Sequence, residues 1–307
     1  MRKAVVLMYL VVLGSFANAQ QDPQFTMFMF DRVSYNPAAA GIDGVLNVTA
    51  LYRNQWAGFD GAPKTGVINI ASPIFSINSG VGLSLYFDEL GQQSTLNGLL
   101  SYNYQIKVGN GMKLGLGVAI GMYNSAMGNE WVANDEVDND TAIPVNGASS
   151  TLFDASFGVV LRSEELYVGL SATHLSGGDL EDLNINLTQH FFFEAGYDFV
   201  VSDAIKLIPN VLVKTDFIST QFDLNMLAMW NNVIWLGASY RFEDAISPMI
   251  GLQYPVGKGE FRLGYAYDVT LSELNNYSNG SHEIFVNYNM SLGKPLSRTK
   301  YKNVRFL

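Results

Sequence analysis

Apolar residues alternate with small or polar residues along most of this chain. Between Lys113 and Met122, Leu, Val, Ile and Met side chains alternate with glycine and alanine. Successive side chains of a β-strand point to opposite faces, so this alternation predicts strands with one continuous hydrocarbon face. The other face carries Gly, Ser, Asn and aromatic residues, where a soluble sheet would carry Lys, Glu and Thr. This combination is typical of the crowded interior of a membrane barrel.

The same period of two recurs in fourteen segments of the sequence. They lie near residues 45–56, 65–73, 79–87, 94–107, 112–124, 151–161, 165–174, 188–201, 204–216, 220–230, 233–242, 246–255, 259–270 and 281–293. Most are long enough to cross the apolar layer with tilt, which takes about 9–11 residues. The sequence therefore predicts an all-β fold, a transmembrane antiparallel β-barrel of about 14 strands over residues 45–293.

The lengths of the connections predict how the barrel is oriented. With the start of the first strand in the periplasm, the short turns such as 109–111 and 202–203 fall on the periplasmic side. The long connections, of which 125–150 is the longest, then fall on the outer side. Short periplasmic turns and longer outer loops are the pattern of outer-membrane barrels. We therefore expect an integral protein of the bacterial outer membrane.

Three segments lie outside the predicted barrel. A basic start, a short apolar core and the small residues at 17–19 predict an export signal over residues 1–19. Residues 20–44 are predicted to form a periplasmic N-terminal segment, with a plug inside the barrel as the alternative. Residues 294–307 are predicted to form a basic periplasmic tail, which contacts either an acidic partner or the inner rim, with a solvated tail as the alternative.

Composition narrows the function classes. The 28 acidic residues outnumber the 18 basic ones, which argues against a nucleic-acid partner. The chain has no cysteine, so it has no thiol nucleophile and no Cys-based zinc site. Neither Gly-x-Ser-x-Gly nor His-Glu-x-x-His occurs, and His174, His190 and His282 lack the spacing of metal ligands. We predict no enzyme activity and no cofactor, and interpret the histidines as polar residues at the membrane interface.

The longest outer loop holds candidates for ligand or partner contacts. The carboxylates of Asp135, Asp138 and Asp140 could bind Ca²⁺ through oxygen ligands, but their spacing does not match an EF-hand. A solvated acidic loop is the favoured interpretation. Trp131 in the same loop is a candidate for protein contact because aromatic residues are enriched at interfaces, with packing on the barrel rim as the alternative.

The predicted inward face bears on whether the barrel conducts. It includes Tyr86, Tyr167, Trp235 and Phe285 and few charges. A diffusion porin usually needs an open lumen with charged residues at a constriction. The inward aromatic residues favour a filled lumen, and a passive porin for small solutes is the alternative function.

Two stretches around the first predicted strand carry a family resemblance. The first reads QDPQFTMFMF over residues 21–30 and YNPAAAG over 35–41, and the second reads YRNQW over 52–56 and FDGAPKT over 59–65. Together they resemble the PorP/SprF family of the Bacteroidetes type IX secretion system, with Asp31 where that family would be expected to carry Asn.

The resemblance implies a barrel of the secretion and gliding motility apparatus that supports export or surface anchoring of an adhesin with a C-terminal sorting domain. It also implies periplasmic secretion components as partners. The family includes core components and paralogues that each serve one surface protein.

The residues of these stretches are candidate partner contacts. By strand parity Arg53 should face inward and pair with an acid or with the N-terminal segment, because an unpaired enclosed charge is costly. The Asn36-Pro37 segment suits close backbone approach. The loop after the first strand either presents its side chains to a secreted partner or only shapes the turn. The predicted contact set is Asn36, Pro37, Arg53, Gln55, Trp56, Phe59, Asp60 and Trp131.

Overall fold

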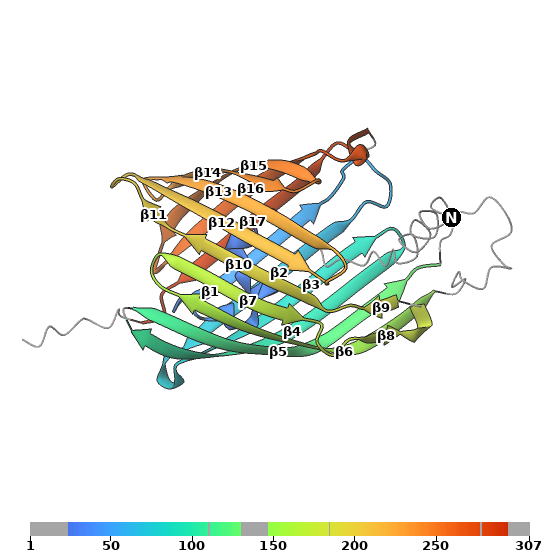
Figure 1. Cartoon of the computed structure of the whole chain (residues 1–307), viewed down its shortest axis with the longest axis horizontal. Coiled ribbons are helices and arrows are strands. Elements are labelled where there is room, and N and C mark those ends of the chain that lie inside the picture. The colour runs from blue at the N-terminus through green and yellow to red at the C-terminus, as the bar shows by residue number, and fades with distance from the viewer. Residues whose placement is uncertain (1–23, 110, 130–146, 184, 277, 294–307) are drawn as a thin grey trace, which may run out of the picture.

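The computed structural model describes residues 24–109, 111–129, 147–183, 185–276 and 278–293, and the chain forms one closed antiparallel barrel (Figure 1). The strands are β1 (Leu46–Asn54), β2 (Lys64–Ile74), β3 (Ser79–Leu90), β4 (Gln93–Gly109), β5 (Met112–Met127), β6 (Ala148–Arg162), β7 (Leu166–Thr173), β10 (His190–Tyr197), β11 (Phe199–Val200), β12 (Ile205–Thr215), β13 (Thr220–Trp230), β14 (Ile234–Arg241), β15 (Ala245–Val256), β16 (Gly259–Thr270) and β17 (Ser281–Met290). The export signal, residues 20–23 and the basic tail lie outside the described residues.

Neighbouring strands pair in order around the whole ring. β1 pairs with β2 on one side and with β17 on the other, and β10 pairs with β12 to close the circle. β10 and the two-residue β11 both pair with β12, so they are two parts of one predicted strand. The prediction of a 14-stranded barrel is therefore confirmed. Closure leaves no open sheet edge, as the lipid phase requires of a spanning sheet.

The outer wall is apolar because the period-two pattern sorts side chains between lipid and interior. On β5, the side chains of Val118, Ile120 and Met122 are 49%, 55% and 54% exposed, while Ala119 between them is buried. Inward positions are mainly small or polar, so the interior can accommodate a further segment of chain. Among the described residues no helix is long and apolar enough to span a bilayer.

The two ends of the barrel differ. One end, the periplasmic end, carries the short turns, including the 3-10 helix η3 (Phe75–Ile77) between β2 and β3. The other, the outer end, carries the longer connections, with the hairpin of β8 (Gly178–Leu180) and β9 (Ile185–Leu187), η5 (Glu181–Leu183) and η6 (Glu273–Asn276). The wall is also uneven: β6 pairs with β5 over residues 148–162 but with β7 only over 157–162. The long strands β4 to β6 therefore form the taller side (Figure 1).

Candidate functional site

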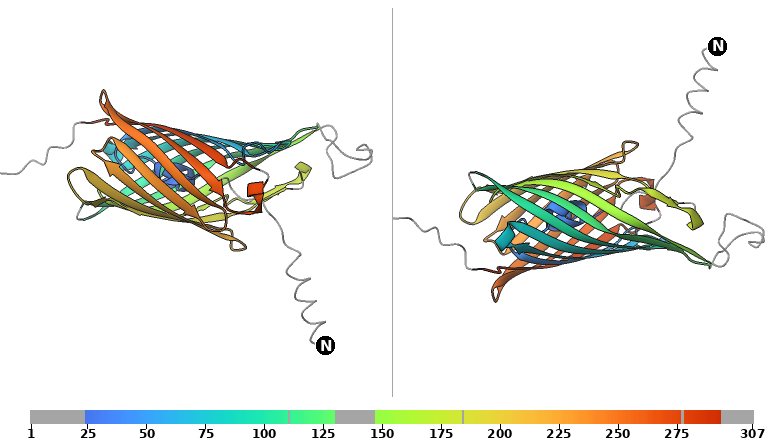
Figure 2. Two further views of the ribbon diagram at one scale, coloured as in Figure 1. Left: turned by 90° about the horizontal axis from the view of Figure 1, so that it is seen from above. Right: turned by 90° about the horizontal axis from the view of Figure 1, so that it is seen from below.

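Residues 24–44, which we call the luminal segment, lie inside the ring of strands (Figure 2). The segment contains η1 (Phe28–Phe30), α2 (Arg32–Tyr35) and η2 (Pro37–Ala39). At its start Gln24 donates to Gln221 at the outer end of β13, and near its end the Ile42 carbonyl accepts from Lys113 at the periplasmic end of β5. The segment therefore runs along the barrel interior from the outer end to the periplasmic end.

A buried charge cluster holds the first residues of the luminal segment. Arg53 of β1 pairs with Asp268 of β16 at 2.6 Å and with Glu283 of β17 at 3.0 Å. The Glu283 carboxylate also accepts from the backbone amides of Thr26 and Met27, at 2.8 and 2.7 Å. The expectation that Arg53 faces inward is confirmed, and its partners include both acids and the N-terminal segment.

Arg241 of β14 extends this cluster around the wall. Its Nε lies 3.1 Å from Asp223, and its Nη1 lies 3.2 Å from Asp244 and 3.6 Å from Asp268. Asp268 thus lies between two guanidinium groups. Charges packed this closely in an enclosed space fix the relative positions of the elements that carry them, because separating any one pair leaves a desolvated charge. The cluster therefore fixes the luminal segment at the outer end.

An aromatic stack anchors the middle of the luminal segment. Phe30 lies between Trp235 of β14 and Phe285 of β17, with ring centroids 4.9 and 4.8 Å apart. Glycines 251 and 264 leave room for the Trp235 ring, because a Cβ at either position would overlap it. The expectation that Tyr167, Trp235 and Phe285 face inward is confirmed by their near-complete burial, and Tyr86 packs partly buried at the edge of the same core.

Replacing Phe30 by Ala is expected to lower the free energy of unfolding by about 3 kcal/mol, the range for a large side chain lost from a core. Phe59→Ala, at a loop position where the side chain is 52% exposed, should change it by less than about 0.5 kcal/mol. Urea unfolding of the detergent-solubilised barrel, followed by tryptophan fluorescence, measures both. Equal, small effects would contradict the anchoring role.

The motif around Asn36 and Pro37 fastens the luminal segment to strands β5, β6 and β7. The Asn36 Nδ2 donates to the carbonyls of Val159 and Leu170, both at 3.2 Å, and its Oδ1 accepts from Ala38 N at 3.0 Å. Gly117 of β5 lies so close that a Cβ there would overlap the Ala38 backbone. The sequence pattern indicated close backbone approach, and this contact is where it occurs.

Asp31 lies in the luminal segment, outside the membrane-spanning strands, and is almost fully buried. Burial raises the pKa of its carboxyl group to about 7, although hydrogen bonds from Ser34 and Asn69 favour the ionised form. The folded-state pKa is above the ordinary value of 3.8, so the folded state binds the proton more tightly than the unfolded state. This group therefore lowers the free energy of unfolding progressively as pH rises from about 4 to about 7, and above pH 7 the lost stability stays constant.

Asp31→Asn should remove this pH dependence and stabilise the barrel at pH 8 by on the order of 2–4 kcal/mol, since one pKa unit corresponds to about 1.4 kcal/mol. The free energies of unfolding of Asp31→Asn and of the unmodified chain, determined at pH 4.5 and pH 8, measure this difference. Asp203→Asn, in an exposed periplasmic turn, is the matched control for the removal of one carboxylate. Identical pH profiles for Asp31→Asn and the unmodified chain would contradict the prediction.

The structure divides the predicted contact residues between the interior and the outer end. Asn36 and Pro37 of the luminal segment are buried against the wall, and Arg53 of the wall is buried against the luminal segment. These three residues therefore have no surface to offer a partner in this arrangement. The remaining described candidates lie at the outer end, where Gln55 and Trp56 are partly buried and Phe59 and Asp60 are exposed. Trp131, Asp135, Asp138 and Asp140 lie outside the described residues.

The interpretation of His174 and His190 as interface residues is wrong. Both side chains turn into the barrel and are only 4% exposed. The His174 Nδ1 lies 2.9 Å from the Asp154 carboxylate, and the two imidazole rings are 6.2 Å apart. His282, by contrast, is partly exposed and contacts the hydroxyl of Tyr265 at 2.6 Å. Within the described part of the chain, no group of three or more His, Asp or Glu side chains could hold a metal ion.

Two cavities lie on different sides of the luminal segment. The cavity towards the outer end, which we call the outer vestibule, has a volume of about 170 Å³ and includes Phe25, Ser34 and Tyr35 in its lining. The cavity towards the periplasmic end has a volume of about 500 Å³ and is lined by Arg32 and Asp43 among other residues. The luminal segment thus separates an outer space from a periplasmic one.

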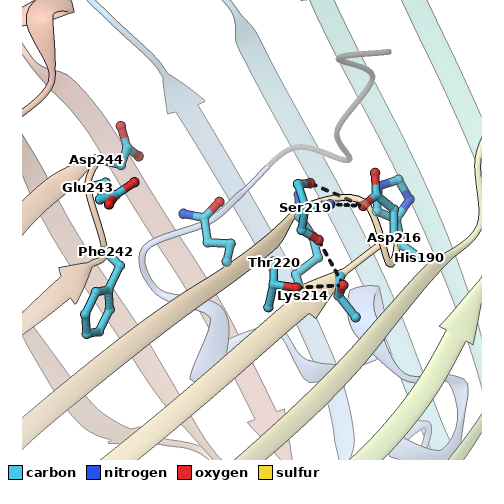
Figure 3. A pocket seen from close by; sticks show the side chains of 10 residues that line it. His190, Lys214, Asp216, Ser219, Thr220, Phe242, Glu243 and Asp244 are labelled. Carbon is cyan, nitrogen blue, oxygen red and sulfur yellow. Dashed lines mark hydrogen bonds between the residues drawn. The ribbon is translucent and has the colours of Figure 1, made fainter. Parts of the chain in front are cut away.

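A smaller pocket of about 150 Å³ lies on the outer rim (Figure 3). Asp216 and Ser219, from the β12–β13 connection, lie on one side of it, and Glu243 and Asp244, from the β14–β15 connection, lie on the other. Backbone amides of Ile218 and Ser219 donate to the Asp216 carboxylate at 2.9 and 2.6 Å, which fixes this turn. The rim pocket shares His190 with the outer vestibule, so the two hollows adjoin.

Comparison with solved structures places the fold among outer-membrane barrels. The toluene transporter TbuX of Ralstonia pickettii is similar with a TM-score of 0.50 and 10% sequence identity, over 84% of this chain and 92% of that one. The P. putida toluene transporter TodX has a TM-score of 0.49 and 7% identity, over 85% and 93% of the two chains. At these identities the likeness concerns the fold alone. No curated protein sequence was found to match.

The sequence also matches one family model over most of its length. The match covers residues 17–288, which include the luminal segment and nearly the whole barrel, and the family is described as type IX secretion system membrane protein PorP/SprF. The closed barrel with an apolar outer wall agrees with this description and places the protein in the outer membrane. The chain belongs to the PorP/SprF family of type IX secretion system membrane proteins.

Proposed function

We propose that the protein is a non-conducting docking barrel that holds a secreted surface protein with a C-terminal sorting domain at its outer end. Periplasmic components of the secretion system would bind at the opposite end. The observation that carries the proposal is the luminal segment, which fills the interior between two separate cavities. A wall closed around its own N-terminal segment suits a rigid platform better than a channel.

A passive porin for small solutes is the second candidate, because similar barrels include structures described as transporters. Diffusion of solutes requires a continuous water-filled path lined by polar groups. In this chain the path is crossed by Phe28, Phe30 and Trp235, which pack into one apolar core with the wall. We therefore favour docking over conduction, and consider the luminal segment a fixed plug.

The test is co-purification from the native outer membrane after mild chemical cross-linking. A tagged copy of the full chain should retain a large secreted protein and a periplasmic secretion component. An unrelated outer-membrane barrel with the same tag, purified in parallel, should retain neither. Recovery of the tagged chain without either class of partner would contradict the docking function.

A further inference from the structure

The outer vestibule is a concave site that opens towards the cell surface. Its floor is formed by Phe25 and Tyr35 of the luminal segment, and its walls come from β2 to β5 on one side and from β7, β9 and β10 on the other. The walls combine aromatic rings, such as Tyr123 and Phe192, with polar groups such as Asp88 and Asn97. Pockets of mixed apolar and polar lining, with a few convergent polar groups, are the usual form of binding sites.

Charge is distributed unequally between the two ends of the barrel. The described outer connections carry acidic residues, including Glu181, Asp182, Asp216, Glu243 and Asp244, and Glu89 lies at the outer end of β3. The basic side chains that the described chain places at this end are Arg53, Lys64, Lys214 and Arg241, of which Arg53 and Arg241 are buried in ion pairs. The rim of the outer end is therefore acidic, and the carboxylate in the lining of the vestibule is that of Asp88. An acidic rim around a concave site attracts and orients cationic groups.

Two buried polar groups of the vestibule wall have an oxygen that could still accept a hydrogen bond. Asn97 is 8% exposed and uses its Nδ2 to donate to Asp154 at 3.1 Å, while its Oδ1 accepts from none of the described residues. The hydroxyl of Thr173, 7% exposed, also has no hydrogen-bond partner among the described residues. Buried polar atoms in folded proteins nearly always have a partner. A ligand that supplies several N–H donors would complete these groups after small side-chain rotations.

We propose that the outer vestibule binds a basic side chain, arginine or lysine, on an exposed segment of the secreted partner. The inference rests on the docking function proposed above and names the chemistry of its outer contact. A guanidinium group supplies donors to the acceptor oxygens and a flat cation to the aromatic rings, where cation–π contacts are favourable. The acidic rim pocket, which adjoins the vestibule at His190, lies where further basic residues of the same segment would pass.

A peptide pair tests the chemistry directly. The probe is a short fluorescein-labelled peptide that carries two arginines and two tyrosines, and its matched control carries citrulline in place of arginine. Fluorescence anisotropy with the full chain in detergent should show at least about tenfold tighter binding of the arginine peptide, a difference of about 1.4 kcal/mol. Equal affinity for the two peptides would overturn the proposal.

Variants locate the binding. Asp88→Asn and Tyr123→Leu, both in the vestibule wall, should each weaken binding of the arginine peptide by about three- to tenfold. Asp182→Asn removes a charge from the same end of the barrel, outside both the vestibule and the rim pocket, and it should leave the affinity within twofold. Equal losses from Asp182→Asn and Asp88→Asn would assign the binding to general surface charge and overturn the proposal. Heat-modifiable migration on gels confirms that each variant is folded.

Two further arms separate this inference from the docking function. If Ca²⁺ displaces the arginine peptide and binds the unmodified chain but not Asp88→Asn, the vestibule is a cation site and the proposal fails. If native-membrane co-purification retains the secreted partner equally on the unmodified chain and on the Asp88→Asn, Tyr123→Leu double variant, docking stands and the vestibule inference fails. If the unmodified chain retains no secreted protein but still selects the arginine peptide, the docking function fails instead.

Discussion

Arg53→Met is expected to destabilise the barrel by about 3–5 kcal/mol, the cost of leaving buried charges without their partner. The variant removes the guanidinium that lies between Asp268 and Glu283, both of them almost inaccessible to solvent. Asp268 would keep Arg241 at 3.6 Å, whereas Glu283 would retain only backbone amides and no ion-pair partner among the described residues. Glu283 therefore accounts for most of the expected loss.

The second-site variant Glu283→Gln tests this account. In the Arg53→Met background it should recover a large part of the lost stability, because a neutral buried pair is often as stable as the ion pair that it replaces. Arg162→Met, which breaks the partly exposed pair with Asp43, is the control at the periplasmic end and should cost no more than about 1 kcal/mol. Urea unfolding in detergent measures all four proteins. A double variant no more stable than Arg53→Met would contradict the assignment of the lost stability to Glu283.

The sequence predicted the barrel because its signal is repeated and local. An alternation of apolar and polar residues over ten or more positions assigns each side chain of a strand to the lipid or to the interior. The position of an arginine within this alternation is then enough to place its side chain inward. The bounds of β13 and β16 agree with the predicted segments to the residue. Side-chain direction depends only on neighbouring residues, and for that reason it could be predicted.

The partners of these side chains depend on register between strands that are far apart in the sequence. Arg53 meets Glu283 because β1 and β17 close the ring, with Arg53 opposite Glu283 in the ladder. No local pattern in either strand indicates that alignment. Strand parity could have placed Asp268 and Glu283 on the inward face, but their convergence on Arg53 follows only from closure.

The luminal segment was difficult to predict for a different reason. Its helical turns are three or four residues long, too short for a hydrophobic period to be detectable. Its path is set by contacts with the wall, such as those of Asn36 with Val159 and Leu170. The strands β8 and β9 could not be predicted either, because each has only three residues. His174 was misassigned because it follows β7 with a positive φ of 54°, so strand parity does not apply to it.

The second large effect concerns conduction. In planar bilayers the unmodified chain is expected to show no steady conductance, because the luminal segment fills the interior. Gly117→Leu should produce open channels, since the new side chain would occupy the space now held by the backbone at Ala38 and so force the luminal segment away from the β5 wall. Deletion of residues 24–44 should produce a larger conductance still, as the whole obstruction is then removed.

Gly66→Leu is the matched control for this substitution. Gly66 lies on β2 between two buried neighbours, so it faces the lipid, and a Cβ there meets nothing within 4 Å. The same change of residue on the outer wall should therefore leave the barrel closed. Steady conductance from the unmodified chain would favour the porin function instead. If neither Gly117→Leu nor the deletion conducts, although both proteins remain folded, something other than the luminal segment closes the lumen.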